Sequence, residues 1–253
     1  MLYSVQSMPL SEGYIGENGR FCELLQKNPR TAHTSQVRMS AFMSAFNELL
    51  RKGTKAILCI TISSRLSGTY SNAVIAAREF PDAKILVVDS QTTAVGTRFL
   101  VEKAAELSRD GMDVGKATDI LEAMRERIGI ALSVEDMDAL RRSGRLGLVR
   151  QSVGTILNIR PVLYCKYGTV VAGKQVRGQS GQISGLVNAI PPHVTHIEIV
   201  SVMEKPVMDL LEKAVRARFS CSIGRSRVGP VLAIHLGVSA IGVAWVQREE
   251  APV

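Results

Sequence analysis

The sequence predicts an α/β protein of two domains, the first of which is built on a parallel sheet. Two apolar strand-like runs, Lys55–Ile62 and Lys84–Val88, lie on either side of a helical segment at Ser71–Phe80. Strand, helix and strand within about 35 residues form a βαβ unit, which implies parallel strands joined by a right-handed crossover.

The second domain is expected to hold a mixed sheet with helices on one side. Two strand-like runs, Val162–Cys165 and Thr169–Val176, are joined by Tyr167–Gly168, a pair typical of a hairpin turn. The pattern changes near residues 144–160, so we place the N-terminal domain at residues 1–146 and the C-terminal domain at residues 147–253.

Apolar periodicity predicts the remaining elements, and residues 1–35 are expected to be irregular. The further helices are expected at Phe42–Leu50, Phe99–Leu107, Ala117–Ile128, Asp136–Arg142, Leu148–Leu157, Ile183–Ile190 and Val207–Ala217. The further strands are expected at Ile130–Val134 in the first domain and at His196–Val202, Val231–Leu236 and Ile241–Val246 in the second.

Length and composition exclude several classes of protein. The chain has 253 residues, 46% hydrophobic and 21% charged, which excludes disorder, collagen and a coiled coil. A membrane span needs about 20 consecutive apolar residues, which the sequence lacks. The N-terminus shows no signal peptide, and four dispersed cysteines have no zinc-ligand spacing. We therefore expect a cytoplasmic protein without a metal or other cofactor.

Several catalytic and phosphate-binding motifs fail. The segment GTVVAGKQ at Gly168–Gln175 resembles a phosphate-binding loop, but Gln175 replaces the required hydroxyl residue and the segment falls in the predicted hairpin. The sequence contains no GxSxG elbow, no GxGxxG and no HExxH. A serine hydrolase is disfavoured, although a Ser–His pair stays open.

The most distinctive segment is ITISSRLSGTY at Ile60–Tyr70, between a predicted strand and the following helix. Ligands of open parallel sheets bind beyond the carboxyl ends of the strands, and the N–H groups of a helix start favour an anion. Ser64 and Ser67 add hydroxyl donors, and Gly68 allows close approach of the backbone. The alternative is a loop that only caps the helix.

A second hydroxyl-rich segment is RTAHTSQ at Arg30–Gln36. Its Thr34 and Ser35 either cap the next helix or bind a ligand. Because the two segments offer neutral donors and no carboxylate, together they suit a singly charged anion.

Six motifs occur in order along the chain. They are TSQ, ITISSRLSGTY, VVDS (Val87–Ser90), LRRSGRL (Leu140–Leu146), LNIRPVL (Leu157–Leu163) and GPVLAIHLG (Gly229–Gly237). Together they resemble the DegV family of bacterial fatty-acid-binding proteins, over most of the chain from Thr34 to Trp245. Relative to that family, the sequence is expected to begin near the second strand, so that either the chain is incomplete at its N-terminus or Leu2–Pro9 substitutes for the first strand.

The resemblance implies a DegV-like fold with an α/β/α first domain and a two-layer second domain. It also implies a lipid carrier, non-catalytic by itself, that buries one long-chain fatty acid and presents the carboxylate to a partner fatty acid kinase, which forms an acyl phosphate. Each buried methylene would contribute about 0.8 kcal/mol to binding. The residues expected at the carboxylate are Thr34, Ser35, Ser64, Ser67, Gly68, His235 and, in the predicted strand, Arg177.

Arg141, Arg142 and Arg145 lie near the predicted domain boundary, with Arg150 and Arg160 close by. They form either a docking surface for an acidic partner or a solvated helix face. The net charge of +8 fits an anionic partner or plain solubility. With 5% aromatic residues, the chain is a poor candidate for binding nucleic acid.

The alternative function is a hydrolase or transferase acting on a small acyl or phosphate compound. In that case Ser64 or Ser67 would be the nucleophile and His235 the base.

Overall fold

A computed structural model describes residues 2–5, 8–11, 19–135, 137–145, 159–203 and 205–249. The strands are β1 (Leu2–Val5), β2 (Met8–Ser11), β3 (His33–Ser35), β4 (Ala56–Thr61), β5 (Lys84–Asp89), β6 (Ile128–Ser133), β7 (Ile159–Lys166), β8 (Thr169–Arg177), β9 (Val194–Ser201), β10 (Ser222–Arg227) and β11 (Ile241–Gln247). The helices are α1 (Gly19–Lys27), α2 (Met39–Arg51), α3 (Thr69–Arg78), α4 (Ala94–Arg109), α5 (Val114–Arg125), α6 (Asp138–Ser143), α7 (Gly178–Ala189), α8 (Pro206–Arg218) and α9 (Pro230–Leu236).

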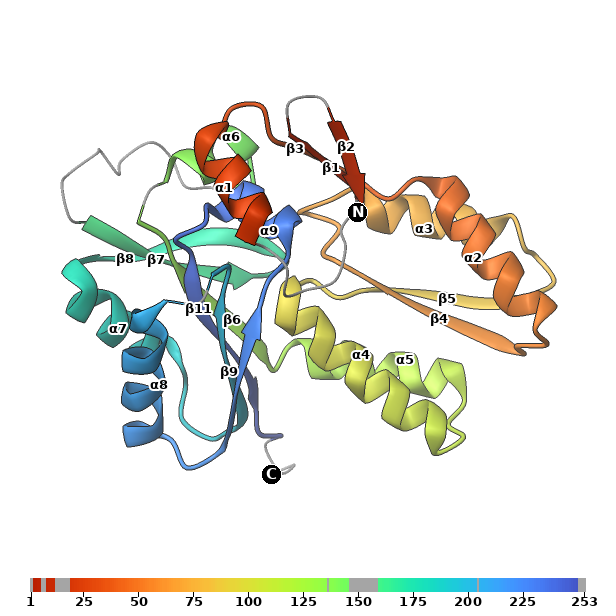
Figure 1. Ribbon diagram of the computed structural model, residues 1–253. Coiled ribbons are helices and arrows are strands. Elements are labelled where there is room, and N and C mark those ends of the chain that lie inside the picture. The colour runs from red at the N-terminus through yellow and green to blue at the C-terminus, as the bar shows by residue number, and fades with distance from the viewer. Residues whose placement is uncertain are drawn as a thin grey trace.

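The expected parallel unit is confirmed. Strands β4 and β5 pair in parallel, with Ala56 opposite Lys84 and Thr61 opposite Asp89. Helices α2 and α3 lie on one face of this sheet and α4 and α5 on the other, so the layers are α/β/α (Figure 1). The carboxyl ends of both strands reach the same edge of the sheet. The loop of residues 62–68 between β4 and α3, called the serine loop below, begins at this edge.

The expected mixed sheet is also confirmed. Its six strands have the order β10-β9-β11-β6-β7-β8, and β10 and β9 are parallel while the other pairs are antiparallel. Helices α7 and α8 lie together beside this sheet (Figure 1). The core between them and the sheet is made of buried side chains that include Leu186, Ile197, Ile199, Leu211 and Val243.

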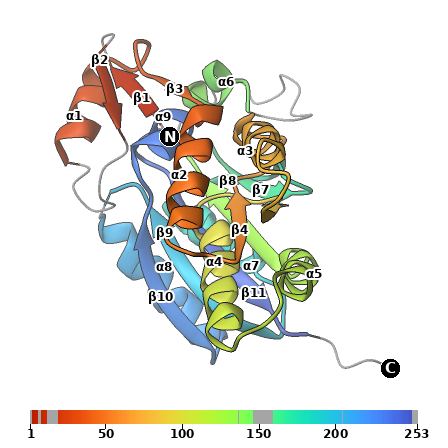
Figure 2. The ribbon, with the colours of Figure 1, turned by 90° about the vertical axis from the view of Figure 1, so that its right-hand side faces the viewer.

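The molecule has two halves, one built on the parallel sheet of β4 and β5 and the other on the six-stranded sheet, and helix α4 joins them. Its Val95 and Phe99 pack against Ile130 and Ala244 of the six-stranded sheet. The same helix contacts β4 of the parallel sheet. Figure 2 shows α4 next to β4, with strands of the six-stranded sheet behind it. The start of α4 therefore lies where the two halves meet.

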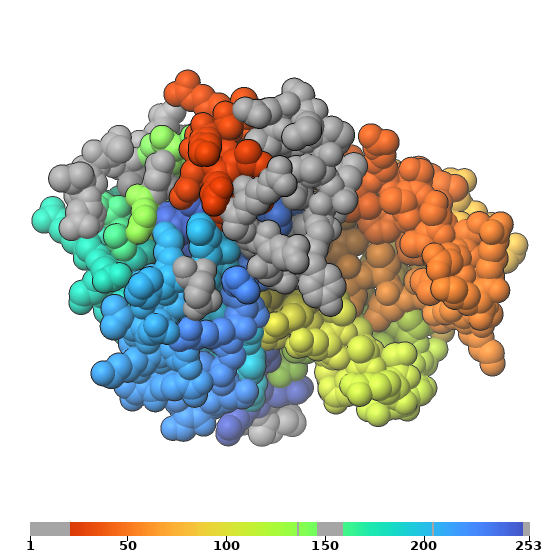
Figure 3. Space-filling view, viewed as in Figure 1, coloured from red at the N-terminus to blue at the C-terminus, as the bar shows by residue number. Residues whose placement is uncertain are grey.

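The described residues among the first 35 include the strands β1, β2 and β3 and the helix α1, so the expectation that residues 1–35 are irregular was wrong for these elements. Helix α1 carries Phe21, Cys22 and Leu25 on one buried face, which packs against the core around Leu163 and Ala233. Strand β1 pairs with β2 and β3 in a three-stranded antiparallel sheet. In the space-filling view, α1 lies against segments from the C-terminal part of the chain (Figure 3).

Three other expectations need correction. Val231–Leu236 is the helix α9 and not a strand, because Pro230 fits the first helical position and Gly237 ends the helix. The strand at Ile130–Val134 lies in the six-stranded sheet as β6, between β11 and β7, and not in the parallel sheet. The polar edge strand β10 was not predicted, because its sequence SIGRSR has too few apolar residues.

The helix expected at Leu148–Leu157, with Arg150, lies outside the described residues. The division at residues 146 and 147 stays a prediction. Among the helices that the structure describes, none is long and apolar enough to cross a membrane.

Candidate functional site

A cavity of about 660 Å³ lies where the two halves of the molecule meet. Its walls come from β3, the serine loop, the start of α4, the six-stranded sheet and α9. Most of the lining is apolar, and the apolar lining residues include Ile62, Leu66, Val95, Leu132, Leu140, Val170, Val231, Leu232 and Leu236. The volume falls within the range of about 300–1,000 Å³ that is common for small-molecule sites.

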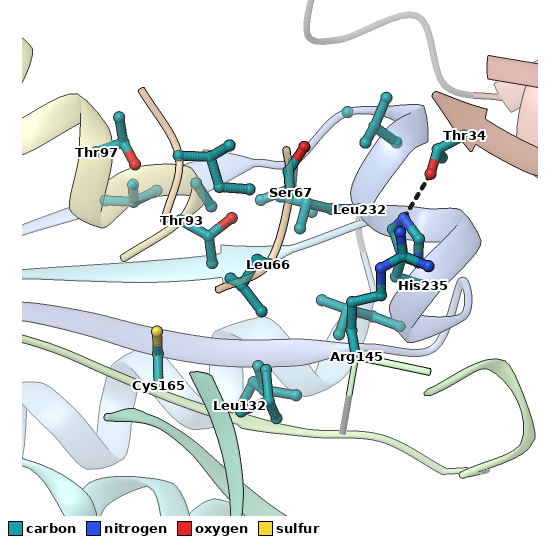
Figure 4. Close-up of a pocket in the computed structure, with 18 of the residues that line it drawn as sticks. Thr34, Leu66, Ser67, Thr93, Thr97, Leu132, Arg145, Cys165, Leu232 and His235 are labelled. Carbon is teal, nitrogen blue, oxygen red and sulfur yellow. Dashed lines mark hydrogen bonds between the residues drawn. The ribbon is translucent and has the colours of Figure 1, made fainter. Parts of the chain in front are cut away.

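Thr34 and His235 meet at one end of this cavity. The two atoms Thr34 Oγ1 and His235 Nε2 are 2.8 Å apart, although they lie 201 positions apart in the chain. Figure 4 shows this contact at one side of the cavity, with Thr97 on the opposite side. Antiparallel pairing of β3 with β1 holds Thr34, and the short helix α9 holds His235.

His235 is uncharged at neutral pH. Burial of the imidazole, and then the positive charge of Arg145, lower its pKa from 6.5 to about 4. Its Nδ1 is buried and has no hydrogen-bond partner among the described residues. If Nε2 carries the proton, the imidazole donates to Thr34 and the threonine hydroxyl proton is spare. If Nδ1 carries it, Nδ1–H is spare, so either tautomer leaves one donor for an acceptor ligand.

Arg145 supplies a positive charge at this end of the cavity. It lines the cavity, and Figure 4 shows its guanidinium beside the ring of His235. We expected Arg145 to form part of a docking surface, and in the structure it also lines the cavity. A guanidinium with nearby hydroxyl and imidazole donors favours a carboxylate.

The two hydroxyl-rich segments are joined beside the same end. Ser67 Oγ lies 2.9 Å from Thr69 Oγ1 and accepts from the Thr69 N–H at 3.2 Å, while the Val37 N–H donates to Thr69 Oγ1 at 3.2 Å. A Cβ on Gly68 would lie only 2.0 Å from Gln36 Oε1, so the glycine makes room for that amide. Ser67 thus accepts a hydrogen bond from the first residue of α3 and also lines the cavity.

The structure brings five of the predicted ligand residues to this cavity. They are Thr34, Ser35, Ser67, Gly68 and His235. Ser64 is exposed and lies in a separate hollow with Ser63 and Asp89, and its N–H donates to Asp89 Oδ1 at 3.1 Å. Arg177 is exposed at the end of β8 and does not line the cavity. The structure therefore does not bring Ser64 and Arg177 to the cavity that Thr34 and His235 share.

Beside the hollow around Ser64, the loop after β4 contacts the turn between β7 and β8. Ser63 is buried, and its hydroxyl donates to the carbonyl oxygen of Gly168 at 2.6 Å. Gly168 (φ 75°) and Tyr167 (φ 49°) form the tight turn between β7 and β8, which confirms the expected hairpin. The failed phosphate motif lies inside that hairpin, as predicted.

The geometry offers little to the hydrolase alternative. Ser64 and His235 line different hollows. Ser67 lines the same cavity as His235, but its hydroxyl lies 2.9 Å from Thr69 Oγ1, and His235 Nε2 pairs with the Thr34 hydroxyl and not with a serine. Over the residues that the structure describes, no cluster of three or more His, Cys, Asp or Glu side chains is placed to hold a metal ion.

Several lining residues were missed by the sequence analysis. Thr93, Thr97 and Arg98 follow β5, Cys165 lies on β7, and Ser226 lies on β10. The rule that selected the serine loop after β4 applies equally to the loop after its parallel neighbour β5. Applied to that loop, the rule predicts Thr93 as a lining residue. The lining residues that come from the six-stranded sheet leave no local pattern in the sequence.

Comparison with known proteins decides the family. The DegV family, described as "Uncharacterised protein, DegV family", matches residues 10–248. The chain belongs to the DegV family. The resemblance seen in the six motifs is thereby confirmed.

Three DegV relatives illustrate the match. A DegV domain-containing protein of Deinococcus radiodurans is 33% identical over 247 residues, which are 93% of this chain and 87% of that protein. A fatty-acid-binding DegV family protein of Thermus thermophilus has a TM-score of 0.87 and 25% identity, covering 98% of this chain and 90% of that chain. The fatty acid kinase (Fak) B3 protein of Streptococcus pneumoniae, solved with linoleic acid, has a TM-score of 0.84 and 19% identity over 98% of this chain and 89% of that chain.

Proposed function

We propose that this DegV protein binds one long-chain fatty acid, with the acyl chain in the 660 Å³ cavity and the carboxylate at the Thr34–His235 end. The observation that carries the proposal is the joining of an apolar cavity to the Thr34–His235 pair, which leaves one hydrogen-bond donor spare, with the positive charge of Arg145 beside it. Binding of a fatty acid by the Thermus thermophilus and Streptococcus pneumoniae relatives supports it.

The physical balance favours such a ligand. Burial of roughly a dozen methylenes stabilises a complex by about 10 kcal/mol before the costs of association are subtracted. The spare donor of the Thr34–His235 pair, the hydroxyls of Ser35 and Ser67 and the charge of Arg145 would then hold the carboxylate.

The proposed role is that of a carrier, non-catalytic by itself, which presents the carboxylate to a partner fatty acid kinase. The name of the Streptococcus pneumoniae relative supports a kinase partner. Arg141 and Arg142 are exposed on α6, directly before Arg145, and we assign them to the docking surface. All four cysteines are free thiols, which supports a cytoplasmic location.

Ligand binding is tested by mass spectrometry of the purified chain, native and after extraction of bound acids. We expect a co-purified long-chain acid, and a folded sample that never carries or takes up an acid refutes the proposal. Thr34→Val keeps the side-chain shape but removes the hydroxyl, and it should weaken binding about tenfold or more, the effect of one hydrogen bond to a charged group.

The matched control is Thr118→Val on α5. Thr118 is half-buried like Thr34, but its hydroxyl donates to the Val114 carbonyl away from the cavity. We expect the affinity of this variant to be unchanged. Equal affinities for Thr34→Val and Thr118→Val would show that the carboxylate lies elsewhere.

The docking surface is tested with Arg142→Glu and a fatty acid kinase. We expect slower formation of acyl phosphate with unchanged fatty acid affinity, because a reversed rim charge opposes association with an acidic surface. Arg109→Glu, at the exposed end of α4, is the control. Equal rates for the two variants would remove α6 from the docking surface.

A further inference from the structure

The cavity has a second polar end. Figure 4 shows Thr97 on the side away from the Thr34–His235 pair. Arg98 follows Thr97 on α4, and both residues line the cavity together with Ser226 and Arg227 at the end of β10. An acyl chain anchored at Thr34 and His235 therefore points its tail toward guanidinium and hydroxyl groups.

A buried carboxylate fixes Arg98 in this position. Glu198 is only 4% exposed, and its Oε1 lies 3.1 Å from Arg98 Nη2 and accepts from the Ser226 hydroxyl. Arg98 Nη1 donates to Ser226 Oγ at 2.9 Å. The other oxygen, Oε2, lies 2.8 Å from His196 Nε2. The Arg98 side chain is 40% exposed, but these contacts hold its guanidinium in one orientation.

Donors at this end outnumber the acceptors that the protein provides. A guanidinium has five N–H donors. The Nε of Arg98 is buried without a hydrogen-bond acceptor in the described part of the chain, and Glu102 Oε1, at 3.4 Å, makes only an ion-pair contact. Arg227 is exposed, and no described acidic side chain lies within ion-pair distance of it. A terminal methyl group placed here would desolvate these donors without replacing their bonds to water.

We propose that Arg98, supported by Glu198 and Ser226, binds an oxygen at the far end of the acyl chain, so that the favoured ligand is a long-chain acid with a terminal hydroxyl or second carboxylate. This inference rests on the proposed function, because it takes the first carboxylate to be at Thr34 and His235. Both terminal groups accept hydrogen bonds, and the hydroxyl and the carboxylate are separate arms of the test.

The test is a competition on the delipidated full chain. Each mixture contains equal amounts of a saturated acid and its ω-hydroxy analogue of the same length, from dodecanoic to octadecanoic acid, and a second set uses the α,ω-diacids. The bound acids are quantified by mass spectrometry after the protein is re-isolated. At the chain length that spans the cavity, we expect the oxygenated acid to be bound in preference to the saturated one. If the far end of the cavity were apolar, the oxygenated acid would be bound roughly fivefold or more weakly than the saturated acid, because its terminal hydroxyl would be buried without a hydrogen-bond partner.

The double variant Arg98→Met with Glu198→Gln removes the guanidinium without leaving an unpaired buried carboxylate. We expect the ratio of oxygenated to saturated acid to fall about tenfold, the effect of a hydrogen bond to a charged group. Binding of the saturated acid should be unchanged or tighter. The matched control is Arg125→Met with Glu122→Gln, an Arg–Glu pair of α5 at 3.2 Å that does not line the cavity. Arg227→Gln, an exposed substitution, should shift the ratio in the same direction even if the double variant fails to fold.

The outcomes separate this inference from the proposed function. If the saturated acid binds and the oxygenated acids are rejected at every length, the second polar end is refuted while the lipid-binding function stands. If the double variant loses the saturated acid as well, the carboxylate itself lies at Arg98 and the inference fails. If no acid binds to the folded protein, the proposed function fails.

Discussion

At the scale of single residues, His235 shows how burial and a neighbouring charge prepare a group for binding. An imidazole next to Arg145 in a largely apolar cavity stays neutral, so it offers hydrogen bonds without adding charge. The positive charge then comes from Arg145, and the direction of the bonds comes from Thr34 and His235. These roles could not be derived from local sequence, because a contact across 201 positions leaves no periodic pattern. The motif resemblance predicted Thr34 and His235, which line the cavity, and it also predicted Ser64 and Arg177, which do not.

The depressed pKa of His235 predicts a pH-dependent stability. The folded pKa is about 4 and the unfolded pKa about 6.5, so between these values the unfolded chain binds more protons. The contribution of His235 is therefore complete above pH 6.5 and is lost as the pH falls toward 4. The loss reaches up to about 3 kcal/mol, since one pKa unit corresponds to about 1.4 kcal/mol.

The measurement is urea unfolding of the wild type and of His235→Gln at both ends of this pH window. Other titrating groups affect both proteins, so the difference between them isolates His235. We expect the wild type to lose more stability on acidification than the variant. Parallel pH profiles would mean that the imidazole is solvated and charged like a surface histidine.

At the scale of elements, helix α9 was predicted as a strand. The run Val231–Leu236 is short and apolar, and such runs cannot be assigned to helix or strand from periodicity alone. The decisive signals were the flanking residues, Pro230 at the first helical position and Gly237 after the last. The βαβ unit around α3 was predicted correctly because its strands and helix are longer and better separated.

Gly237 should be a sensitive position, since it ends the helix that carries His235. Its φ of 79° and ψ of 160° fall in a region that is essentially restricted to glycine, whereas Gly144, with φ 67° and ψ 13°, is in the left-handed helical region that asparagine also adopts. A Cβ at either position meets no close contact, so the comparison isolates the backbone. We expect Gly237→Asn to lower the free energy of unfolding by about 1–3 kcal/mol and Gly144→Asn to have a much smaller effect.

Urea unfolding of the two variants measures this difference, and fatty acid affinity provides a second readout. Gly237→Asn should also weaken binding, because a shifted α9 moves His235 away from Thr34. Equal stabilities of the two variants would contradict the backbone argument.

At the scale of the whole molecule, the cavity exists only where the two halves meet. The sequence predicted both sheets, because each follows from local periodicity and turn residues. It did not predict that β6 joins the six-stranded sheet or that α4 packs on both sheets, because these contacts are set by tertiary packing. The lining residues Arg98 and Ser226 were missed for the same reason.

A ligand that contacts both halves must stabilise the whole fold. Its binding to the native state alone raises the free energy of unfolding by about 2.7 kcal/mol at a free concentration of about one hundred times the dissociation constant. We expect fatty acid addition to raise the unfolding midpoint of the delipidated protein in one cooperative step. Hydrogen exchange should slow both at the start of α4 and in α9, since residues of each line the cavity. Protection confined to one half would place the acyl chain outside the cavity, because a chain lying between Thr34–His235 and Thr97 necessarily contacts the two halves together.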